Sequence, residues 1–419
     1  MSTTSSELRS GSGLSTWRTP FVIIACGCAI GMLSFGPRSS LGFFIQPMSR
    51  DFAWGRDVFG LAIALQNLLW GLGQPLAGAV ADRFGTMRVM WGGALLYAGG
   101  LLLMRYAATP LSLDLGAGVM IGFGLAGCSF NLVLSAFTKL LPPERRGIAL
   151  GFGTAAGSFG QFLFAPFGVA MIDNFGWQTA LVVFGALMLL ILPFSLALSA
   201  PPAATSAAPA SDQQTFRTAL AEAFGHRSYV LLVLGFFTCG FQLAFIATHL
   251  PAYLRDKGLQ PGDAVAALAV IALANVAGTY AFGLLGARLR RKNVLAGIYL
   301  ARSAAMALFV LLPLSPATLL MFAATMGFIW LGTLPLTNGI VGQVFGVRHI
   351  GSLFGFVFFG HQFGSFLGVW LGGVVFERTH SYDLVWLLAM ALGVLAAALH
   401  WPIDDRALAR TGPLVREHA

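Results

Sequence analysis

GAVADRFGTMR, residues 78–88, is a short charged turn between two long apolar runs. Asp82 and Arg83 end the first run, Gly85 follows them, and Arg88 opens the second run. Such a turn is typical of helices that cross a bilayer and return. The composition agrees, because 57% of the 419 residues are hydrophobic and only 10% are charged. Soluble domains carry about 25% charged residues, so the chain is suited to a membrane.

Working outward from this turn, we predict twelve spanning helices, since each crossing needs about 20 mostly apolar residues. The fold class is therefore an all-α membrane protein of two pseudo-symmetric six-helix bundles. The predicted helices are 20–47, 57–80, 87–106, 113–140, 147–172, 177–199, 228–253, 264–287, 293–313, 316–341, 349–376 and 382–402. The predicted domains are a tail at 1–19, bundles at 20–199 and 228–402, an Ala-, Pro- and Ser-rich linker at 200–227, and a tail at 403–419.

The basic residues predict how the chain sits in the membrane. With both termini in the cytoplasm, the tails and cytoplasmic loops hold 17 of the 25 Lys and Arg residues, and the outer loops hold 6. Arg38 and Arg302, inside predicted helices, complete the count. This asymmetry follows the positive-inside rule, so we expect a multi-pass protein of the bacterial inner membrane. It also explains the net charge of +9 without a nucleic-acid partner.

The two halves of the sequence repeat each other. GIALGFGTAAGSFGQFLFAPFG (147–168) aligns with GSLFGFVFFGHQFGSFLGVWLG (351–372). Glycines and one Phe coincide in this alignment at an offset of 204, so the fifth predicted helix corresponds to the eleventh. Two like bundles are the plan of a carrier with alternating access. The glycine rows allow helices to approach closely, either for packing alone or for a hinge.

The turn at 78–88 resembles the loop motif between helices 2 and 3 of the major facilitator superfamily. In that family a Gly, an Asp-Arg pair, a second Gly and a basic residue recur. The resemblance implies a gating motif made of Gly78, Asp82, Arg83, Gly85 and Arg88. The alternative is a solvated turn that obeys the positive-inside rule. The copy in the second half has Ala287 at the position of Asp82, so we expect an asymmetric lock.

Arg38 lies in an otherwise apolar helix, in GPRSSLGFFIQPM (36–48). A charge at this depth usually faces a water-filled cavity or a partner, although an arginine can also snorkel to the headgroups. The stretch resembles the first helix of the monocarboxylate transporters, where a Pro-(Lys or Arg)-Ser step precedes aromatic residues. That resemblance implies that Arg38 lies on the substrate path and binds an anion.

The chain departs from the monocarboxylate pattern on the eighth helix. That family carries an Asp and an Arg four residues apart, and Asn275 and Thr279 stand at these positions here. Both residues are neutral, so an identical proton–carboxylate mechanism is not expected. Both can still hydrogen-bond an organic anion, and we include them among the substrate-binding residues.

All 16 Asp and Glu residues fall in predicted loops, tails or helix ends, so the usual carboxylate relay for protons is missing. His361 is the candidate for proton coupling, because an unperturbed histidine titrates near pH 6.5; a hydrogen-bonded packing role is the alternative. Arg302 is expected to be a structural buried charge, with a substrate role left open. Further polar candidates for the cavity are Gln66, Asn67, Asn131, Gln242, Asn338 and Gln362.

No enzyme motif, P-loop or metal-ligand cluster is recognisable, and no cofactor is implied. We therefore expect a secondary transporter, acting as a monomer, whose partners are a small anionic substrate, the bilayer and a coupling proton. A carrier that exports amphipathic drugs or metabolites is the alternative, because the cavity has few charges and the chain has 36 Phe residues. A sensor that binds a ligand without moving it is a third hypothesis.

Overall fold

The computed structural model describes residues 17–199, 216–346 and 350–408, and within these ranges the chain is helical without strands. The first half contains α1 (Pro20–Ser40), η1 (Leu41–Phe44), α2 (Ile45–Phe52), α3 (Arg56–Phe84), α4 (Thr86–Arg105), α5 (Pro110–Leu113), η2 (Asp114–Met120), α6 (Ile121–Gly127), α7 (Phe130–Leu140), α8 (Pro143–Leu189), α9 (Ile191–Ser195) and η3 (Leu196–Leu198). The second half contains α10 (Phe216–Gly225), α11 (Arg227–Asp256), α12 (Pro261–Arg288), α13 (Arg291–Leu311), α14 (Pro316–Phe328), α15 (Thr333–Phe345), α16 (Ile350–Thr379) and α17 (Asp383–His400).

Local sequence explains where many of these helices begin. Proline occupies the first position of α1, α5, α8, α12 and α14, where its missing N–H has no helical partner to lose. Thr19 caps α1 by accepting a hydrogen bond from the backbone of Val22 at 3.3 Å, as N-cap hydroxyls do. These starts lie within a few residues of the predicted ones.

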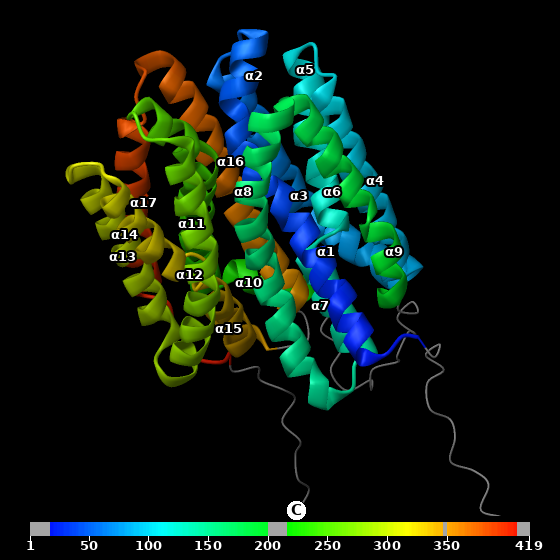
Figure 1. Ribbon diagram of the computed structural model, residues 1–419. Helices are drawn as coiled ribbons and strands as arrows, with labels where there is room; N and C mark the ends of the chain where they lie inside the picture. The colour runs from blue at the N-terminus through cyan, green and yellow to red at the C-terminus, as the bar shows by residue number, and fades with distance from the viewer. Residues whose placement is uncertain (1–16, 200–215, 347–349, 409–419) are drawn as a thin grey trace, which may run out of the picture.

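Ten stretches among the described residues are long and apolar enough to cross a membrane. One of them, Glu144–Leu198, has 55 residues, which is about twice the length that a 30 Å hydrocarbon core needs. Gly176, with φ of 82°, interrupts it, and the chain turns back there (Figure 1). The 29-residue α3 corresponds to the second predicted crossing. The count of twelve crossings remains a prediction.

Each half has its own hydrophobic core. One cluster of buried side chains is drawn mainly from residues 22–198 and the other mainly from residues 220–408. Figure 1 shows the blue-to-green half beside the yellow-green-to-red half. Of the predicted linker at 200–227, residues 200–215 lie outside the described residues, and residues 216–225 form α10, which packs against α11 through Phe224 and Tyr229. We call residues 17–199 the first half and residues 216–408 the second half.

The sequence repeat has a counterpart in packing. A Cβ on Gly160 of α8 would lie 2.5 Å from the carbonyl oxygen of Met32 in α1. A Cβ on Gly364 of α16 would lie 2.0 Å from the carbonyl oxygen of Phe237 in α11. In both halves a glycine of the fifth helix thus lets it contact the backbone of the first helix. This favours the packing interpretation of these glycines.

Two predicted helices break near their middle, and those expected at 20–47 and 177–199 contain short 3-10 turns. The helix expected at 113–140 is π-helical over η2 and breaks between α6 and α7, and the helix expected at 316–341 breaks between α14 and α15. At the first break Ser129 caps α7 by accepting from the backbone of Leu132 at 3.4 Å. At the second, Ile329, Trp330 and their neighbours leave the helix. Such breaks are tolerated within a bilayer where protein groups satisfy the backbone.

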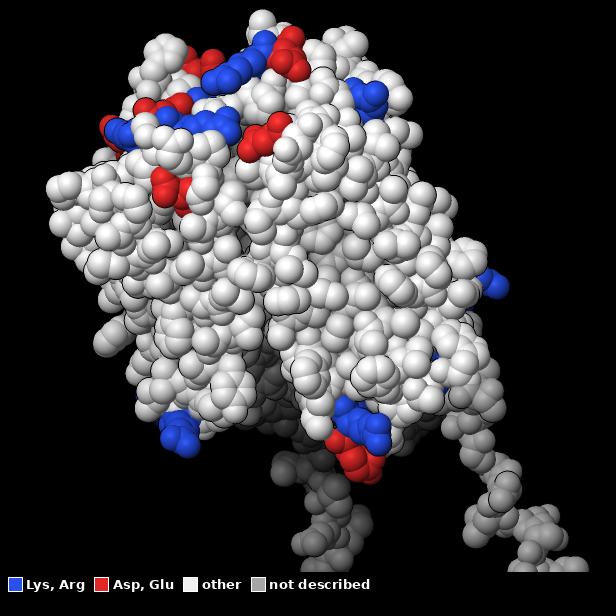
Figure 2. All heavy atoms as spheres, viewed as in Figure 1, with Lys and Arg blue, Asp and Glu red and all other residues white. Residues whose placement is uncertain are grey.

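The two ends of the bundle differ. The start of α1 and residues 401–408 lie at the lower end in Figure 1. We call this the termini end, and the opposite end the distal end. On the face drawn in Figure 2, most charged side chains lie toward these two ends, and an uncharged surface lies between them. That distribution is expected of a protein that spans a bilayer.

Candidate functional site

Arg38, in the last turn of α1, turns toward the protein interior. Its Nη2 donates a 2.5 Å hydrogen bond to Oδ1 of Asn67 in α3, and its guanidinium carbon lies 4.9 Å from the ring centre of Trp70. Asn67 is fully buried, and its Nδ2 donates to the carbonyl of Ile63, which aims Oδ1 at Arg38. The Nε of Arg38 has no hydrogen-bond partner among the described residues. The guanidinium therefore keeps an unused donor.

An aromatic path leads from Arg38 across the interface between the halves. The ring of Trp70 lies 5.4 Å from that of Phe358 in α16, edge to face. Phe358 in turn stacks on His361 with 5.8 Å between ring centres. Trp70 also donates from Nε1 to Gln74 at 3.2 Å. Arg38 and His361, one from each half, are thus linked by an aromatic pair rather than by a direct contact.

His361 and Gln362 form the second-half side of this region. The Nδ1 of His361 lies 3.0 Å from Oε1 of Gln362, and its Nε2 has no hydrogen-bond partner among the described residues. The His361 side chain is half-buried and Gln362 is buried. Gly71 of α3 lets Gln362 approach, since a Cβ there would lie 2.6 Å from the Cβ of Gln362. The two halves are therefore in close contact at this level.

Asn275 also lies at the interface, but its polar atoms are in use. Its Nδ2 donates to Oγ of Ser158 in α8 at 2.9 Å, which joins the two halves. Its Oδ1 accepts from the backbone N–H of Leu331 at 3.0 Å and from Oγ1 of Thr279 at 3.2 Å. Asn275 and Thr279 thus stabilise the break between α14 and α15 in this state.

The other candidates lie elsewhere. Gln242 is fully buried inside the second half, where its Nε2 donates to the carbonyl of Ala389 in α17 at 2.9 Å. Asn131 is an exposed residue of α7. Arg302 is fully buried and donates to the carbonyls of Ile329 and Trp330, and its structural role stays a prediction. The structure does not bring these three to Arg38.

The predicted gating motif forms the turn from α3 to α4. Gly85 has φ of 91°, a conformation that favours glycine, while Arg83 and Arg88 are exposed. A Cβ on Gly78 would meet nothing within 4 Å. The side chain of Asp82 lies outside the described side chains. The gating role of this motif therefore stays a prediction.

The distal end carries a connection between the halves that the sequence did not reveal. Arg56, at the start of α3, forms a salt bridge with both carboxylate oxygens of Asp256 in α11 at 2.6 and 2.7 Å. It also donates to the hydroxyl of Tyr382 at 3.0 Å and lies 3.8 Å from the ring centre of Phe376. The backbone N–H of Arg56 donates to Glu377 at 2.6 Å. We call this set the distal lock.

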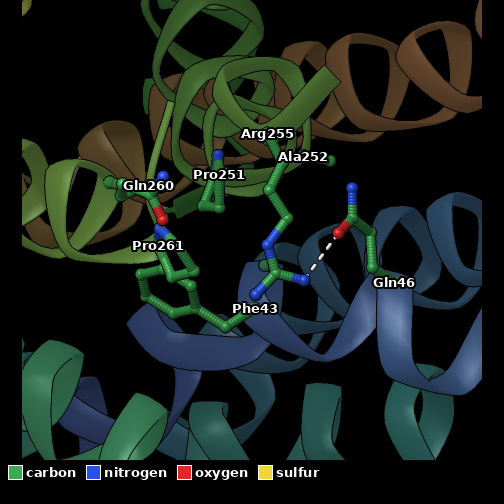
Figure 3. A pocket seen from close by; sticks show the side chains of 9 residues that line it. Phe43, Gln46, Pro251, Ala252, Arg255, Gln260 and Pro261 are labelled. Carbon is green, nitrogen blue, oxygen red and sulfur yellow. Dashed lines mark hydrogen bonds between the residues drawn. The ribbon is translucent and has the colours of Figure 1, made fainter. Parts of the chain in front are cut away.

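A second contact lies nearby. Nη1 of Arg255 in α11 donates to Oε1 of Gln46 in α2 at 2.6 Å (Figure 3). The space between Phe43, Pro251 and Pro261 has a volume of about 10 Å³, which is room for about one water. The interface is therefore sealed at this level. No local pattern relates residue 46 to 255 or residue 56 to 256, so only the fold could show these pairs.

At the termini end the halves separate. Figure 2 shows the surface hollowed between the two lower lobes. The helices nearest this opening are α7, α8 and α15 in Figure 1. The two larger grooves, of about 450 and 630 Å³, lie elsewhere: one between α3, α4 and α6, and one between α12, α13 and Ile329, which follows α14. The fold and site together define a helical membrane carrier with one sealed end.

The chain belongs to the major facilitator superfamily, whose sequence pattern matches residues 27–369. This establishes a multi-pass membrane transporter. The chain is 28% identical to the uncharacterized MFS-type transporter YcxA of Bacillus subtilis, covering 88% of this chain and 91% of that protein. It is 26% identical to human monocarboxylate transporter 11, covering 94% of this chain and 84% of that protein. The predicted resemblance to the superfamily is thereby confirmed.

Solved structures confirm the fold. A bacterial homolog of the human lysosomal transporter Spinster, in an inward-facing and unoccupied conformation, superposes with a TM-score of 0.74 at 17% identity, covering 95% of this chain and 100% of that chain. A D-xylose–proton symporter superposes with a TM-score of 0.70 at 16% identity, covering 93% of this chain and 99% of that chain. At these identities the likeness concerns the fold alone.

Proposed function

We propose that this transporter moves a small organic anion of the monocarboxylate type by alternating access. The observation that carries the proposal is the inward-turned Arg38 with its unused Nε. A guanidinium in this setting can bind a carboxylate through charge-assisted hydrogen bonds. The similarity to proteins named monocarboxylate transporters supports the same substrate class.

The sealed distal end and the separated termini end correspond to one state of such a cycle. With both termini in the cytoplasm of a bacterium, as the charge asymmetry predicts, this state opens inward. Rocking of the halves would have to break the distal lock and the Asn275–Ser158 hydrogen bond. The expected monomer in the inner membrane is consistent with one cleft per chain. We infer no nucleic-acid partner and no enzymatic activity.

Proton symport is the coupling that we favour. The support is that His361 stacks on Phe358, whose ring contacts Trp70 of the first half, and that Nε2 has no hydrogen-bond partner among the described residues. Asn275 and Thr279 stand where the monocarboxylate pattern has an acid and a base, and they bond to each other and to the break of α14 and α15. Coupling through a membrane carboxylate is therefore not proposed.

The test is uptake of radiolabelled pyruvate or lactate into proteoliposomes containing the full chain. Arg38→Gln removes the charge and shortens the side chain but keeps a hydrogen-bonding group, and uptake should fall at least about 100-fold, as loss of a charged contact of about 3 kcal/mol predicts. Arg105→Gln is the matched control, because Arg105 is a half-buried arginine at the end of α4 whose guanidinium lies 4.9 Å from the Tyr106 ring. Equal uptake by wild type and Arg38→Gln would remove Arg38 from the mechanism.

Export of amphipathic compounds is the second candidate, and the aromatic surroundings of Arg38 favour it. Trp70 lies 5.7 Å from Phe35, and Phe35 lies 6.5 Å from Phe130, measured between ring centres. Such a wall suits an apolar ligand with a polar group. Growth of a susceptible host with and without the protein on a panel of antibiotics and dyes distinguishes the two. Resistance without pyruvate or lactate flux would favour export.

A further inference from the structure

Each half carries one of the two larger grooves, and the two grooves correspond to each other. The first groove lies between α3, α4 and α6, and the second lies between α12, α13 and Ile329. At an offset of 205, which aligns Arg83 with Arg288 in the sequence, eight lining residues of the first groove coincide with eight of the second. Val89 and Val294 are one such pair. The groove is therefore a feature of the repeated fold.

A glycine keeps each groove open. Gly92 in α4 and Gly297 in α13 are another matched pair of lining residues. Both are exposed, and a Cβ on either would meet nothing within 4 Å. Neither glycine therefore serves close helix packing, in contrast to Gly160 and Gly364. Because glycine weakens a helix interior relative to alanine, a glycine at the same open position in both halves indicates that the space is used.

The second groove opens toward the bilayer and away from the cleft between the halves. Helix α13 packs mainly against α12, α14, α15 and α17, which all belong to the second half. Figure 1 shows α13 and α14 on the side of the second half that lies away from the first half. Leu285 and Leu289, which line the groove, are exposed. The groove is therefore separate from the Arg38 region and is accessible to lipid.

The groove ends at two arginines without a partner inside the described protein. Arg288 ends α12 and Arg290 precedes α13, and both are exposed and line the groove. Neither forms a hydrogen bond or ion pair with a described residue. The next two residues differ, because Arg291 donates to Gln343 and Lys292 donates to a backbone carbonyl after α17 at 2.6 Å. No acidic residue is among the described residues that line the groove, so the two arginines can bind an anion.

The length of the groove matches one leaflet of a bilayer. From Arg290 to Ala301, the last lining residue on α13, the helix rises about 16 Å. Half of a hydrocarbon core of about 30 Å is about 15 Å. Helix α12 starts at the distal end with Pro261, so the arginines after its last turn lie at the termini end. A basic end joined to an apolar groove of this length fits the headgroup and one acyl chain of a phospholipid.

We propose that the second groove binds an anionic phospholipid from the leaflet at the termini end. Its phosphate lies on Arg288 and Arg290, and one acyl chain runs along α13 past Gly297 to Ile329, at the break between α14 and α15. Basic pockets between spanning helices bind anionic headgroups in this way. Arg88 is the single arginine among the lining residues of the first groove, so the same lipid binds there about fivefold more weakly. The site does not depend on which substrate is transported.

The test is native mass spectrometry of the full chain in detergent, titrated with phosphatidylglycerol or with phosphatidylcholine of the same acyl chains. All proteins carry Arg88→Gln, which removes the arginine of the first groove. This parent should bind phosphatidylglycerol at least about tenfold more tightly than phosphatidylcholine. Arg288→Gln with Arg290→Gln should weaken phosphatidylglycerol binding about 30-fold, because each arginine contributes about fivefold. Phosphatidylcholine binding should not change.

Arg217→Gln with Arg227→Gln is the matched control for charge. These exposed arginines at the starts of α10 and α11 belong to the same half and do not line the groove, so binding of both lipids should stay unchanged. Only compact charge states are counted, so an unfolded fraction does not enter the comparison. Equal phosphatidylglycerol binding by the parent and by Arg288→Gln with Arg290→Gln, or an equal loss in the control, would overturn the headgroup site.

Gly297→Leu tests the acyl chain separately, because it fills the groove and leaves the arginines in place. Phosphatidylglycerol binding should fall at least about tenfold, whereas Gly283→Leu, at an exposed open position of α12 outside the groove lining, should leave it unchanged. Unchanged binding in Gly297→Leu would overturn the position of the chain. Displacement of the lipid by inorganic phosphate, or a dimer that Gly297→Leu dissociates, would show a free anion or a second copy in its place and would overturn the lipid as occupant.

Discussion

Arg56→Gln should open the distal end. The substitution removes two charge-assisted bonds to Asp256, at 2.6 and 2.7 Å, together with the contact with the Phe376 ring at 3.8 Å. The side chains of Arg56 and Asp256 are 13% and 32% exposed, so solvent screens the pair only in part. The distal-sealed state loses these contacts, and a state that is open at this end, in which they are already broken, loses nothing.

The size of the effect follows from the exposure. Hydrogen bonds to charged groups contribute about 1.5–3 kcal/mol, whereas fully exposed ion pairs contribute about 0.2–1 kcal/mol. For a pair that is mostly buried on one side and a third exposed on the other, we expect about 2 kcal/mol. That free energy corresponds to a change of about 30-fold in the ratio of sealed to open molecules.

The measurement is a distance distribution between spin labels placed on either side of the seal. Asn174→Cys in the first half and Leu384→Cys in α17 are exposed distal-end positions, in a Cys26→Ser and Cys28→Ser background. Arg56→Gln should add a longer-distance population that is absent or minor in the parent. Arg56→Asp combined with Asp256→Arg should restore the shorter distance in part.

Lys257→Gln is the matched control for the distal lock. Lys257 is an exposed cation next to Asp256, and its ammonium lies 5.7 Å from the ring of Tyr253 within α11. Its removal changes the distal charge by the same amount without breaking a described contact between the halves. If Arg56→Gln and Lys257→Gln give the same distances as the parent, the distal lock does not hold the two halves together.

Three further predictions concern helix packing and turns. Gly278→Ala in α12 should lower the melting temperature sharply, because the new Cβ would lie 1.7 Å from a carbonyl oxygen at the end of α14. Gly283→Ala in the same helix is the control: its Cβ meets nothing within 4 Å, so the melting temperature should stay the same or rise slightly. Asn275→Ala should lower the free energy of unfolding by about 1–3 kcal/mol because it leaves the part-buried backbone N–H of Leu331 unpaired, and Ser158→Ala should lower it by about 1 kcal/mol. Equal melting temperatures of the two variants would contradict the role assigned to Asn275 at the break. Gly85→Ala should lower the free energy of unfolding by about 1–2 kcal/mol, since the φ of Gly85 is 91°. An unchanged midpoint of denaturant unfolding would show that the turn can adopt another conformation.

Much of the site could be anticipated, but the roles of its members could not. Arg38 stood out because a cation in an apolar helix needs a reason, and the structure turns it inward as that argument expects. Asn275 stood out because it stands at the position of the acid in the monocarboxylate pattern, yet its amide is used by Ser158 and by the break between α14 and α15. A polar side chain in a membrane span can hydrogen-bond either to a ligand or to the backbone, and the sequence alone does not distinguish these two roles.

The sequence by itself determined the membrane class, the two repeated halves and the approximate ends of the helices, because length, hydropathy and proline or glycine positions act locally along the chain. It also identified the superfamily through the turn at 78–88. Only the tertiary structure decided that Arg56 and Asp256 join the halves at the distal end, and that Asn275 bonds to Ser158 across the interface. These contacts join residues 200 and 117 positions apart, and such pairs are fixed by how the helices pack, which hydropathy does not encode.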